Sequence, residues 1–410
     1  MKTHITFHLV TLFLAFMAGV APAEERNARF ITLAGHPGAE DMVIAYRMSA
    51  DGDVVVGEAP TDAVHGEGAV AERRRDGSWT VRRTGFFAVR QSNESPALGV
   101  SKNGRVVVGF GSYGNPEVAM PWASFDGGPL TALGLLSGDI TGLPFDASTH
   151  GQCIVGWGST GTSDRFGSDA PFRHALLWTQ TGATPAMIDP PPAGPVDSTA
   201  VAIAQGGRII VGFAQSARSA TNHYLASDAR GHEAIVWTRH GHKNYERQFL
   251  GALPDHPFYS RAVGISQDGE RITGISGVTD DRHAVLWTLA HHRNHLERFE
   301  IQDLGTLPGY TASGAEAISA DGRVVVGSCS SDVNGDFVAV AFIWDEQHGM
   351  RDLAAFLGAH GATISPDLTL VSGNGLSRDG RHISGYAYDL DFNLLAWVAE
   401  LPRNLGVKLE

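Results

Sequence analysis

The stretch AEAISADGRVVVG, Ala315 to Gly327, followed by AVAFIW, Ala339 to Trp344, is the clearest copy of a pattern that recurs seven times in this chain. Each copy has a small-residue segment, a turn around glycine, a Val/Ile run that ends in glycine, and an apolar segment that ends in tryptophan. The turn glycine and the closing glycine are always five residues apart. A fixed internal period indicates one supersecondary unit that is used repeatedly.

Three marker positions define the repeat along the 410 residues. The turn glycines are Gly52, Gly104, Gly151, Gly207, Gly269, Gly322 and Gly380. The closing glycines are Gly57, Gly109, Gly156, Gly212, Gly274, Gly327 and Gly385. The tryptophans that follow are Trp79, Trp122, Trp178, Trp237, Trp287, Trp344 and Trp397. The eighth tryptophan, Trp157, lies outside this register.

The length and composition of the repeat favour a propeller blade. Successive turn glycines are 47 to 62 residues apart, which suits a four-stranded blade better than the shorter coil of a solenoid. Short apolar runs separated by Gly, Asp, Asn and Pro are typical of strands and hairpins. The run Val324 to Val326 does not alternate with polar residues, as expected of a strand buried on both faces. The sequence therefore predicts an all-β β-propeller of seven blades, each with four antiparallel strands.

One repeat can be divided into its four expected strands. The small-residue segment Ala315 to Ser319 is the first, the Val run the second, the segment ending in tryptophan the third, and a stretch such as Ile301 to Gly305 the fourth. The Asp321-Gly322 pair predicts a tight two-residue hairpin turn between the first two, because glycine supplies positive φ. We expect every tryptophan of the repeat to lie on a buried third strand.

The two ends of the pattern are out of phase. Residues Arg29 to Gly35 match the fourth strand of a unit, whereas the last unit stops at Trp397 to Pro402 without one. We therefore expect the N-terminal strand to complete the seventh blade and close the ring, which also removes two open sheet edges. Residues 24–410 are interpreted as a single domain.

The N-terminus has the parts of a secretory signal. Lys2 precedes an apolar run from Ile5 to Val20 and the small residues Ala21-Pro22-Ala23, so we expect residues 1–23 to be removed. The alternative is an N-terminal membrane anchor, but the run is short for a span of about 20 residues. No later segment is long and apolar enough to cross a bilayer, and we expect an exported protein.

Charge and cysteine content narrow the partners. The net charge of −13 becomes −14 once Lys2 is removed, and an acidic chain without basic clusters disfavours nucleic acid and anionic membranes as partners.

The only cysteines, Cys153 and Cys329, lie at different offsets of their repeats. We interpret them as buried free thiols, with a single disulfide as the alternative. We expect a monomer.

The chain resembles the HAF family of bacterial extracellular repeats. The resemblance is carried by DLGTLPGYTASGAEAISADGRVVVG at Asp303 to Gly327, HAVLW at His283 to Trp287 and RHALLW at Arg173 to Trp178. The His-Ala-Phe tripeptide that names the family is only approximated here. The resemblance covers essentially the whole mature chain. It implies an exported, periplasmic or extracellular, β-rich repeat protein, and it implies no activity, ligand or catalytic residues.

Two polar clusters are candidate metal sites. Asp332, Asn334 and Asp336 have the alternating oxygen spacing of a calcium loop but lack the bidentate Glu downstream. Asn334-Gly335 is also an ideal hairpin turn, and an exposed turn is the stronger interpretation. The histidines of the 291–295 segment form a cluster in one connection, which is more typical of a solvated linker than of a converging metal site. Calcium is the one cofactor that the sequence suggests.

No nucleophile elbow, phosphate loop, zinc motif or carboxylate pair stands out, so no catalytic residues are predicted. Connections between second and third strands, such as 158–172, 214–232 and 328–338, vary most, and they are interpreted either as a recognition surface or as tolerated surface drift. The leading hypothesis is a non-enzymatic binding scaffold for a protein, glycan or small ligand. The alternatives are a secreted hydrolase or lyase with its site at the channel mouth, and a purely structural cell-surface protein.

Overall fold

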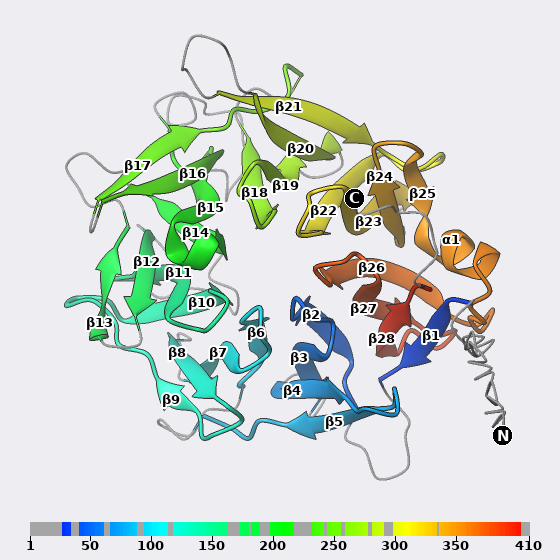
Figure 1. The fold of residues 1–410 in the computed structure, drawn as a ribbon, viewed down its shortest axis with the longest axis horizontal. Helices are drawn as coiled ribbons and strands as arrows, with labels where there is room; N and C mark the ends of the chain where they lie inside the picture. The colour runs from blue at the N-terminus through cyan, green and yellow to red at the C-terminus, as the bar shows by residue number, and fades with distance from the viewer. Residues whose placement is uncertain are drawn as a thin grey trace, which may run out of the picture.

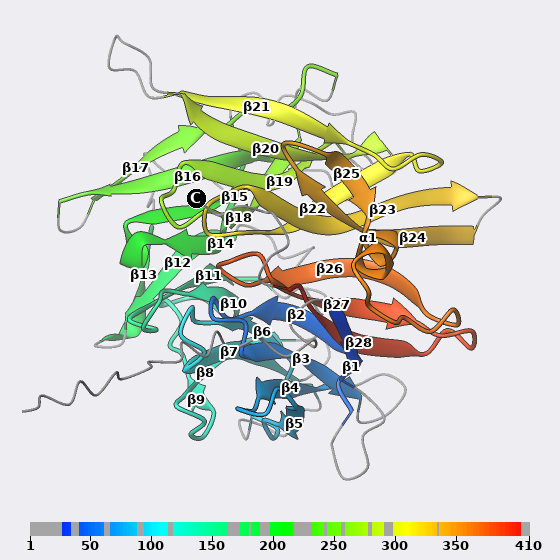
Figure 2. The ribbon, with the colours of Figure 1, turned by 45° about the vertical axis from the view of Figure 1, so that its right-hand side comes forward.

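The computed structural model describes residues 27–33, 41–60, 66–87, 94–113, 118–161, 173–179, 182–188, 197–216, 231–241, 244–255, 259–277, 281–290, 298–333 and 336–402. Within these ranges, seven antiparallel sheets of four strands each surround a central axis (Figure 1). In the turned view of Figure 2 the sheets are stacked around the ring with their faces toward one another. The fold is the predicted seven-bladed β-propeller.

In each blade the chain runs from the innermost strand to the outermost and then crosses to the next blade. Blade 1 consists of β2 (Ile44–Met48), β3 (Val54–Pro60), β4 (Gly66–Arg73) and β5 (Trp79–Arg83). Blade 2 consists of β6 (Ala97–Val100), β7 (Val106–Tyr113), β8 (Val118–Phe125) and β9 (Thr131–Ala132). Blade 3 consists of β10 (Thr141–Ala147), β11 (Cys153–Ser159), β12 (His174–Thr179) and β13 (Gly182–Met187).

The remaining blades follow the same order. Blade 4 consists of β14 (Ser198–Ala204), β15 (Ile209–Ala214), β16 (Glu233–His240) and β17 (Asn244–Phe249). Blade 5 consists of β18 (Ser260–Ile265), β19 (Arg271–Ser276), β20 (His283–Ala290) and β21 (Arg298–Gly305). Blade 6 consists of β22 (Ala312–Ile318), β23 (Val324–Val333), β24 (Asp336–Asp345) and β25 (Gly349–Asp352), and is followed by helix α1 (Leu353–Ala359).

Blade 7 closes the ring as expected. It consists of β26 (Thr369–Leu376), β27 (His382–Tyr388), β28 (Leu394–Glu400) and, as its outermost strand, β1 (Arg29–Thr32) from the N-terminus. Phe30 pairs with Ala399, and its ring packs against Trp397 at a centroid distance of 5.7 Å. Figure 1 shows the blue β1 beside the red β28. Strands from opposite ends of the chain thus share one sheet.

The turn between the first and second strands is built from side chains as well as from glycine. In blade 6, the N–H of Val324 donates to Ser319 Oγ at 3.0 Å, and Ser319 Oγ donates to Asp321 at 2.6 Å. Asp321 also accepts the N–H of Arg323, and Gly322 has a φ of 73°. Four residues separate Ser319 from Val324, so the predicted two-residue turn is wrong, although the positive φ at glycine is confirmed.

A steric restriction explains why the closing position of each repeat is glycine. Every first strand carries a β-bulge opposite this glycine, as between Ala262 and Gly264 opposite Gly274. The bulge turns a carbonyl toward the glycine, so a Cβ on Gly274 would lie 1.9 Å from the Arg261 oxygen. In all seven blades a Cβ at this position would lie within 2.1 Å of a first-strand carbonyl oxygen. Only glycine fits there.

Six of the seven repeat tryptophans lie on buried third strands as predicted. Trp79 is the exception, because it begins β5, the outermost strand of blade 1, and packs in the core cluster that includes Val81. The third strand of that blade, β4, has Ala69, Val70 and Ala71 at its buried centre and no tryptophan. Trp157 follows the closing Gly156 on β11 and is also fully buried.

Hydroxyl groups join neighbouring blades. The N–H of Ala284 on β20 donates to the Oγ of Ser313 at 2.8 Å, and the N–H of Ser313 donates to the Arg282 carbonyl at 2.8 Å. Ala234 and Ser260 repeat this contact between blades 4 and 5. The small residues of the first strand therefore serve close inter-blade packing. Both cysteines are buried free thiols, as predicted.

Candidate functional site

The seven turns between first and second strands meet around one end of the axis. The residue before the turn glycine is Asp, Asn or His in six blades and Gly206 in blade 4. The residue one position earlier lines the cavity at the axis in every blade. Backbone hydrogen bonds link these preceding residues in sequence: Gln267 N–H donates to Ala320 O at 2.8 Å, Ala320 N–H to Arg378 O at 3.2 Å, and Arg378 N–H to Ala50 O at 2.7 Å. Ala50 N–H then donates to Lys102 O at 2.9 Å. Blades 5, 6, 7, 1 and 2 are thereby joined at the channel mouth.

A cavity of about 390 Å³ lies inside this ring, and all seven blades contribute to its wall. Its floor is apolar, because each first strand ends in an aliphatic or thioether side chain just before the turn. The floor residues are Met48, Ile203, Ile265, Ile318 and Leu376. A cavity of this size with an apolar floor and a polar rim is typical of a small-ligand site.

The rim of the cavity carries amides, hydroxyls and two cations. Gln205, Gln267 and Asn103 supply amides, whereas Lys102 and Arg378 supply positive charge. The Lys102 ammonium lies 3.5 Å from the carboxylate of Asp146. The exposed Arg378 guanidinium has no hydrogen-bond or ion-pair partner among the residues that the structure describes.

Carboxylates surround the outer opening. A second cavity of about 570 Å³ shares Ala50, Ala320 and Arg378 with the first, so the two are continuous. Its wall includes the four turn aspartates of blades 1, 5, 6 and 7: Asp51, Asp268, Asp321 and Asp379. Each uses Oδ1 to accept hydrogen bonds within its own turn. The inner cavity therefore contains two cations and Asp51, whereas carboxylates outnumber cations in the outer cavity.

Glu316, on the innermost strand of blade 6, lies near arginines of two other blades. Glu316 is half-buried on β22, and burial raises its pKa, whereas the charges of Arg47 and Arg282 lower it. Arg282 belongs to the neighbouring blade 5, and Arg47 lies on β2, the innermost strand of blade 1. The Nε atom of Arg282 is buried and has no hydrogen-bond partner among the described residues.

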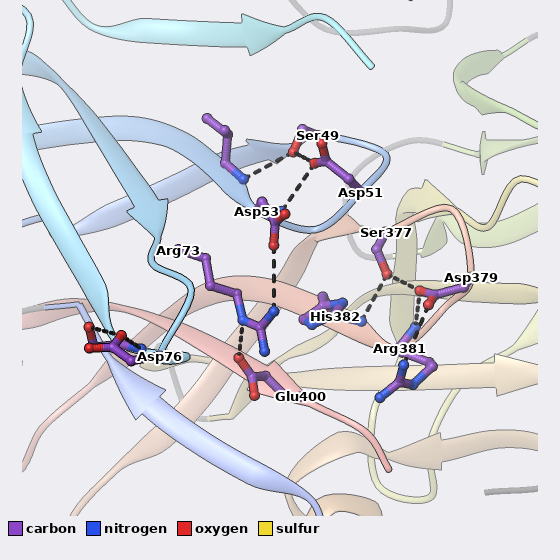
Figure 3. Close-up of polar contacts among 12 residues, drawn as sticks. Ser49, Asp51, Asp53, Arg73, Asp76, Ser377, Asp379, Arg381, His382 and Glu400 are labelled. Carbon is purple, nitrogen blue, oxygen red and sulfur yellow. Dashed lines mark hydrogen bonds and ion pairs between the residues drawn. The ribbon is translucent and has the colours of Figure 1, made fainter. Parts of the chain in front are cut away.

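The seam between blades 7 and 1 lies beside the mouth (Figure 3). Arg73 Nε lies 2.9 Å from Glu400 Oε1, and Arg29 Nη1 lies 3.2 Å from Glu400 Oε2. His382 packs against the turn at Gly52, and burial lowers its pKa, although the nearby Glu400 and Asp379 act to raise it. The seam groups hold the ring closed, and none of these four side chains lines the mouth cavity.

A buried polar group lies at the opposite end of blades 3 to 5. Arg173 Nε lies 3.2 Å from Asp197 Oδ1, and His232 Nε2 lies 3.6 Å from Asp197 Oδ2. Burial lowers the pKa of His232; it acts to raise that of Asp197, but hydrogen bonds from His232 and the charge of Arg173 hold the Asp197 pKa below its usual value. These groups begin strands at the ends away from the Ser-Asp-Gly turns, so they do not belong to the mouth.

The predicted calcium residues lie far from the axis, on the β23–β24 hairpin. Asp332 is exposed on β23 and pairs with Phe337, Asn334 lies outside the described residues, and Asp336 begins β24. In the described ranges, no three His, Cys, Asp or Glu side chains are grouped as a metal site. Calcium binding at Asp332, Asn334 and Asp336 remains a prediction. Residues 291–297 and most of the second-to-third-strand connections also lie outside the described residues.

Sequence reasoning missed the residues of the mouth. The position two residues before each turn glycine holds five different residue types among the seven blades: Ala50, Lys102, Thr149, Gln205, Gln267, Ala320 and Arg378. The signal for them was positional, since each directly precedes the Asp-Gly or equivalent pair of its repeat. A motif search finds positions that hold the same residue in every repeat, and it overlooks a position where the residue differs between repeats.

The fold and this axial cavity define a seven-bladed β-propeller with a potential binding site at one channel mouth. No protein-family model matches the sequence, and no curated protein matches it. In the described part of the chain, no helix has both the length and the hydropathy to cross a bilayer.

Solved structures share the fold at low sequence identity. An oligogalacturonate lyase from Vibrio parahaemolyticus is 10% identical over 92% of this chain and 98% of its own, with a TM-score of 0.53. Prolyl oligopeptidase B from Galerina marginata is 8% identical over 90% of this chain and 50% of its own, with a TM-score of 0.51. A putative TolB from Agrobacterium tumefaciens is 13% identical over 82% and 98%, with a TM-score of 0.42. The first two likenesses show the propeller fold alone.

Proposed function

We propose that this chain is a non-enzymatic, exported binding propeller that holds its ligand at the channel mouth formed by the seven first-to-second-strand turns. The observation that carries the proposal is the continuous cavity with an apolar floor and a polar rim, where Arg378 has no partner among the described residues. Loops and turns at one end of a rigid scaffold are common binding sites. Export is supported by the signal-like residues 1–23.

A thermal-shift screen tests this proposal, because a ligand that binds only the native state raises the melting temperature. The screen uses peptides, glycans, organic acids and divalent ions on the wild type and on Ala320→Trp, which places an indole in both cavities. Ala132→Trp, on the exposed outer strand β9, is the matched control. We expect the hits to stabilise the wild type and the control but not Ala320→Trp. Hits that stabilise all three proteins equally would place binding elsewhere.

The repeats are proposed to be of the HAF type. Support comes from the alanines of RHALLW and HAVLW, since Ala175 and Ala284 are both buried where their strands contact a serine of the next blade. A small side chain after histidine therefore suits the close packing between blades.

The hydrolase or lyase alternative rests on one observation, the half-buried Glu316 with its raised pKa among arginines of other blades. A carboxylic acid with a raised pKa is suited to general acid chemistry. Assays for new reducing ends and for unsaturated products on neutral and acidic polysaccharides test this alternative. Activity that Glu316→Gln abolishes without unfolding the protein would establish it against the binding proposal.

A further inference from the structure

The channel mouth has an ordered change in chemistry along the axis. The aliphatic side chains and Lys102 line only the inner cavity, Arg378 and Asp51 line both cavities, and Asp268, Asp321 and Asp379 line only the outer one. A complementary ligand carries an apolar group at its tip, a negative group directly beside it, and a positive group further back. This order restricts the ligand more than the size of the cavity does.

The geometry of the ring explains why the two cations can act together. Ala50 lies between them, since its N–H donates to Lys102 O and its carbonyl accepts the N–H of Arg378. Ala50 and Ala320 lie on either side of Arg378 in the ring, and their short side chains leave space around its guanidinium. The Arg378 fork is suited to bidentate binding of a carboxylate. The backbone groups of this arc are used within the ring, so recognition falls to side chains.

The C-terminal residue of a peptide has the required order of groups. An apolar side chain and the α-carboxylate branch from one Cα, and basic residues upstream lie on the solvent side. We infer that the mouth binds the free C-terminus of a peptide that ends in an apolar residue and carries basic residues a few positions before it. This inference rests on the proposed binding function and names its ligand class.

Each part of the peptide has a counterpart. The terminal side chain packs on the floor that includes Ile265 and Ile318, the carboxylate pairs with Arg378 and Lys102, and the basic residues face Asp268, Asp321 and Asp379. Figure 3 shows one end of this acidic arc, where the turns at Asp51 and Asp379 lie on neighbouring blades. The amide of Gln267 faces the peptide backbone, whereas the Gln205 amide donates to the Asp268 carbonyl and supports the rim. The combined cavity is larger than a single amino acid needs, which favours a peptide over a free amino acid.

Fluorescence anisotropy with a labelled hexapeptide, Lys-Lys-Gly-Ser-Ala-Leu, tests the inference on the full mature chain. We expect C-terminal amidation, replacement of the last Leu by Ser, and replacement of both Lys by Glu each to weaken binding at least tenfold. Arg378→Ala is expected to weaken the free-acid peptide at least tenfold and to leave the amidated peptide nearly unchanged. Arg105→Ala, an exposed arginine of the same face that does not line either cavity, is the charge-matched control.

Several outcomes would overturn the inference. Equal binding of the acid and the amide would show that the carboxylate is not recognised, and an unaffected Arg378→Ala would show that this residue does not recognise it. Competition by free leucine at the affinity of the hexapeptide would reduce the ligand to an amino acid. If the peptide fails while other ligands stabilise wild type and not Ala320→Trp, the ligand class is wrong and the proposed binding function stands.

Discussion

One carbonyl oxygen determines the closing glycine of each repeat. At Gly274 the first-strand bulge places the Arg261 oxygen 1.9 Å from where a Cβ would lie, and this oxygen belongs to the backbone. We expect Gly274→Ala to lower the free energy of unfolding by about 3 kcal/mol through this overlap. Gly358→Ala in α1 is the control, because nothing lies within 4 Å of its Cβ and a helical alanine is favoured over glycine by about 1 kcal/mol. Urea denaturation measures both, and an equal effect of the two would contradict this explanation.

The buried imidazole of His382 contributes to the pH dependence of stability. Burial lowers the pKa of His382 in the folded state, whereas histidine in an unfolded chain has a pKa of about 6.5. Between these two values the unfolded state binds more protons, so stability falls as the pH decreases through about 6.5 and levels off below the native pKa. We expect His382→Gln to reduce the slope of unfolding free energy between about pH 7 and 5. The exposed His150→Gln is the control, and identical slopes for all three proteins would exclude His382 as a source.

At the level of elements, the strands could be predicted because their chemistry repeats. Turn glycines and Val runs located β2 to β28 in order, and the phase of Arg29 to Gly35 located β1. Trp79 was misplaced because its blade uses Ala-Val-Ala in the third strand, and tryptophan alone does not distinguish a third strand from a fourth. The prediction of a two-residue turn was wrong because the serine hydroxyl accepts a backbone N–H five residues later, a local contact that the Asp-Gly pair alone does not indicate.

The strand seam gives an element-level prediction. Glu400 on β28 is nearly buried and holds Arg29 of β1 and Arg73 of β4. We expect Glu400→Gln to cost about 1.5–3 kcal/mol, as for hydrogen bonds to charged groups. Glu72→Gln is the matched control, because its 3.3 Å contact with Arg82 is exposed and such pairs contribute less than about 1 kcal/mol. Chemical denaturation compares the two, and an equal loss would show that the seam depends little on Glu400.

At the scale of the whole molecule, the mouth exists only because the ring is closed. The mouth cavity draws two to four residues from each of seven blades, which are spread over more than 300 residues of sequence. No local motif records that convergence, so the sequence indicated a propeller and left the position of the site open. The acidic turns were recognisable as turns, whereas the neighbours of Arg378 in the ring, Ala50 and Ala320, come from other blades.

Closure of the ring by the N-terminal strand is the claim on which the mouth depends, and a cross-link tests it most directly. Phe30 and Ala399 are paired across β1 and β28, and opposite residues of antiparallel strands have Cβ atoms about 4.5–5.5 Å apart. We expect Phe30→Cys with Ala399→Cys to form a disulfide in the folded protein, detected by mass spectrometry of the linked peptides. Phe30→Cys with Ala132→Cys, on β9 of blade 2, should remain unlinked. Failure of the first pair to link in a folded protein, or efficient linking of the second, would contradict the closed seven-bladed ring.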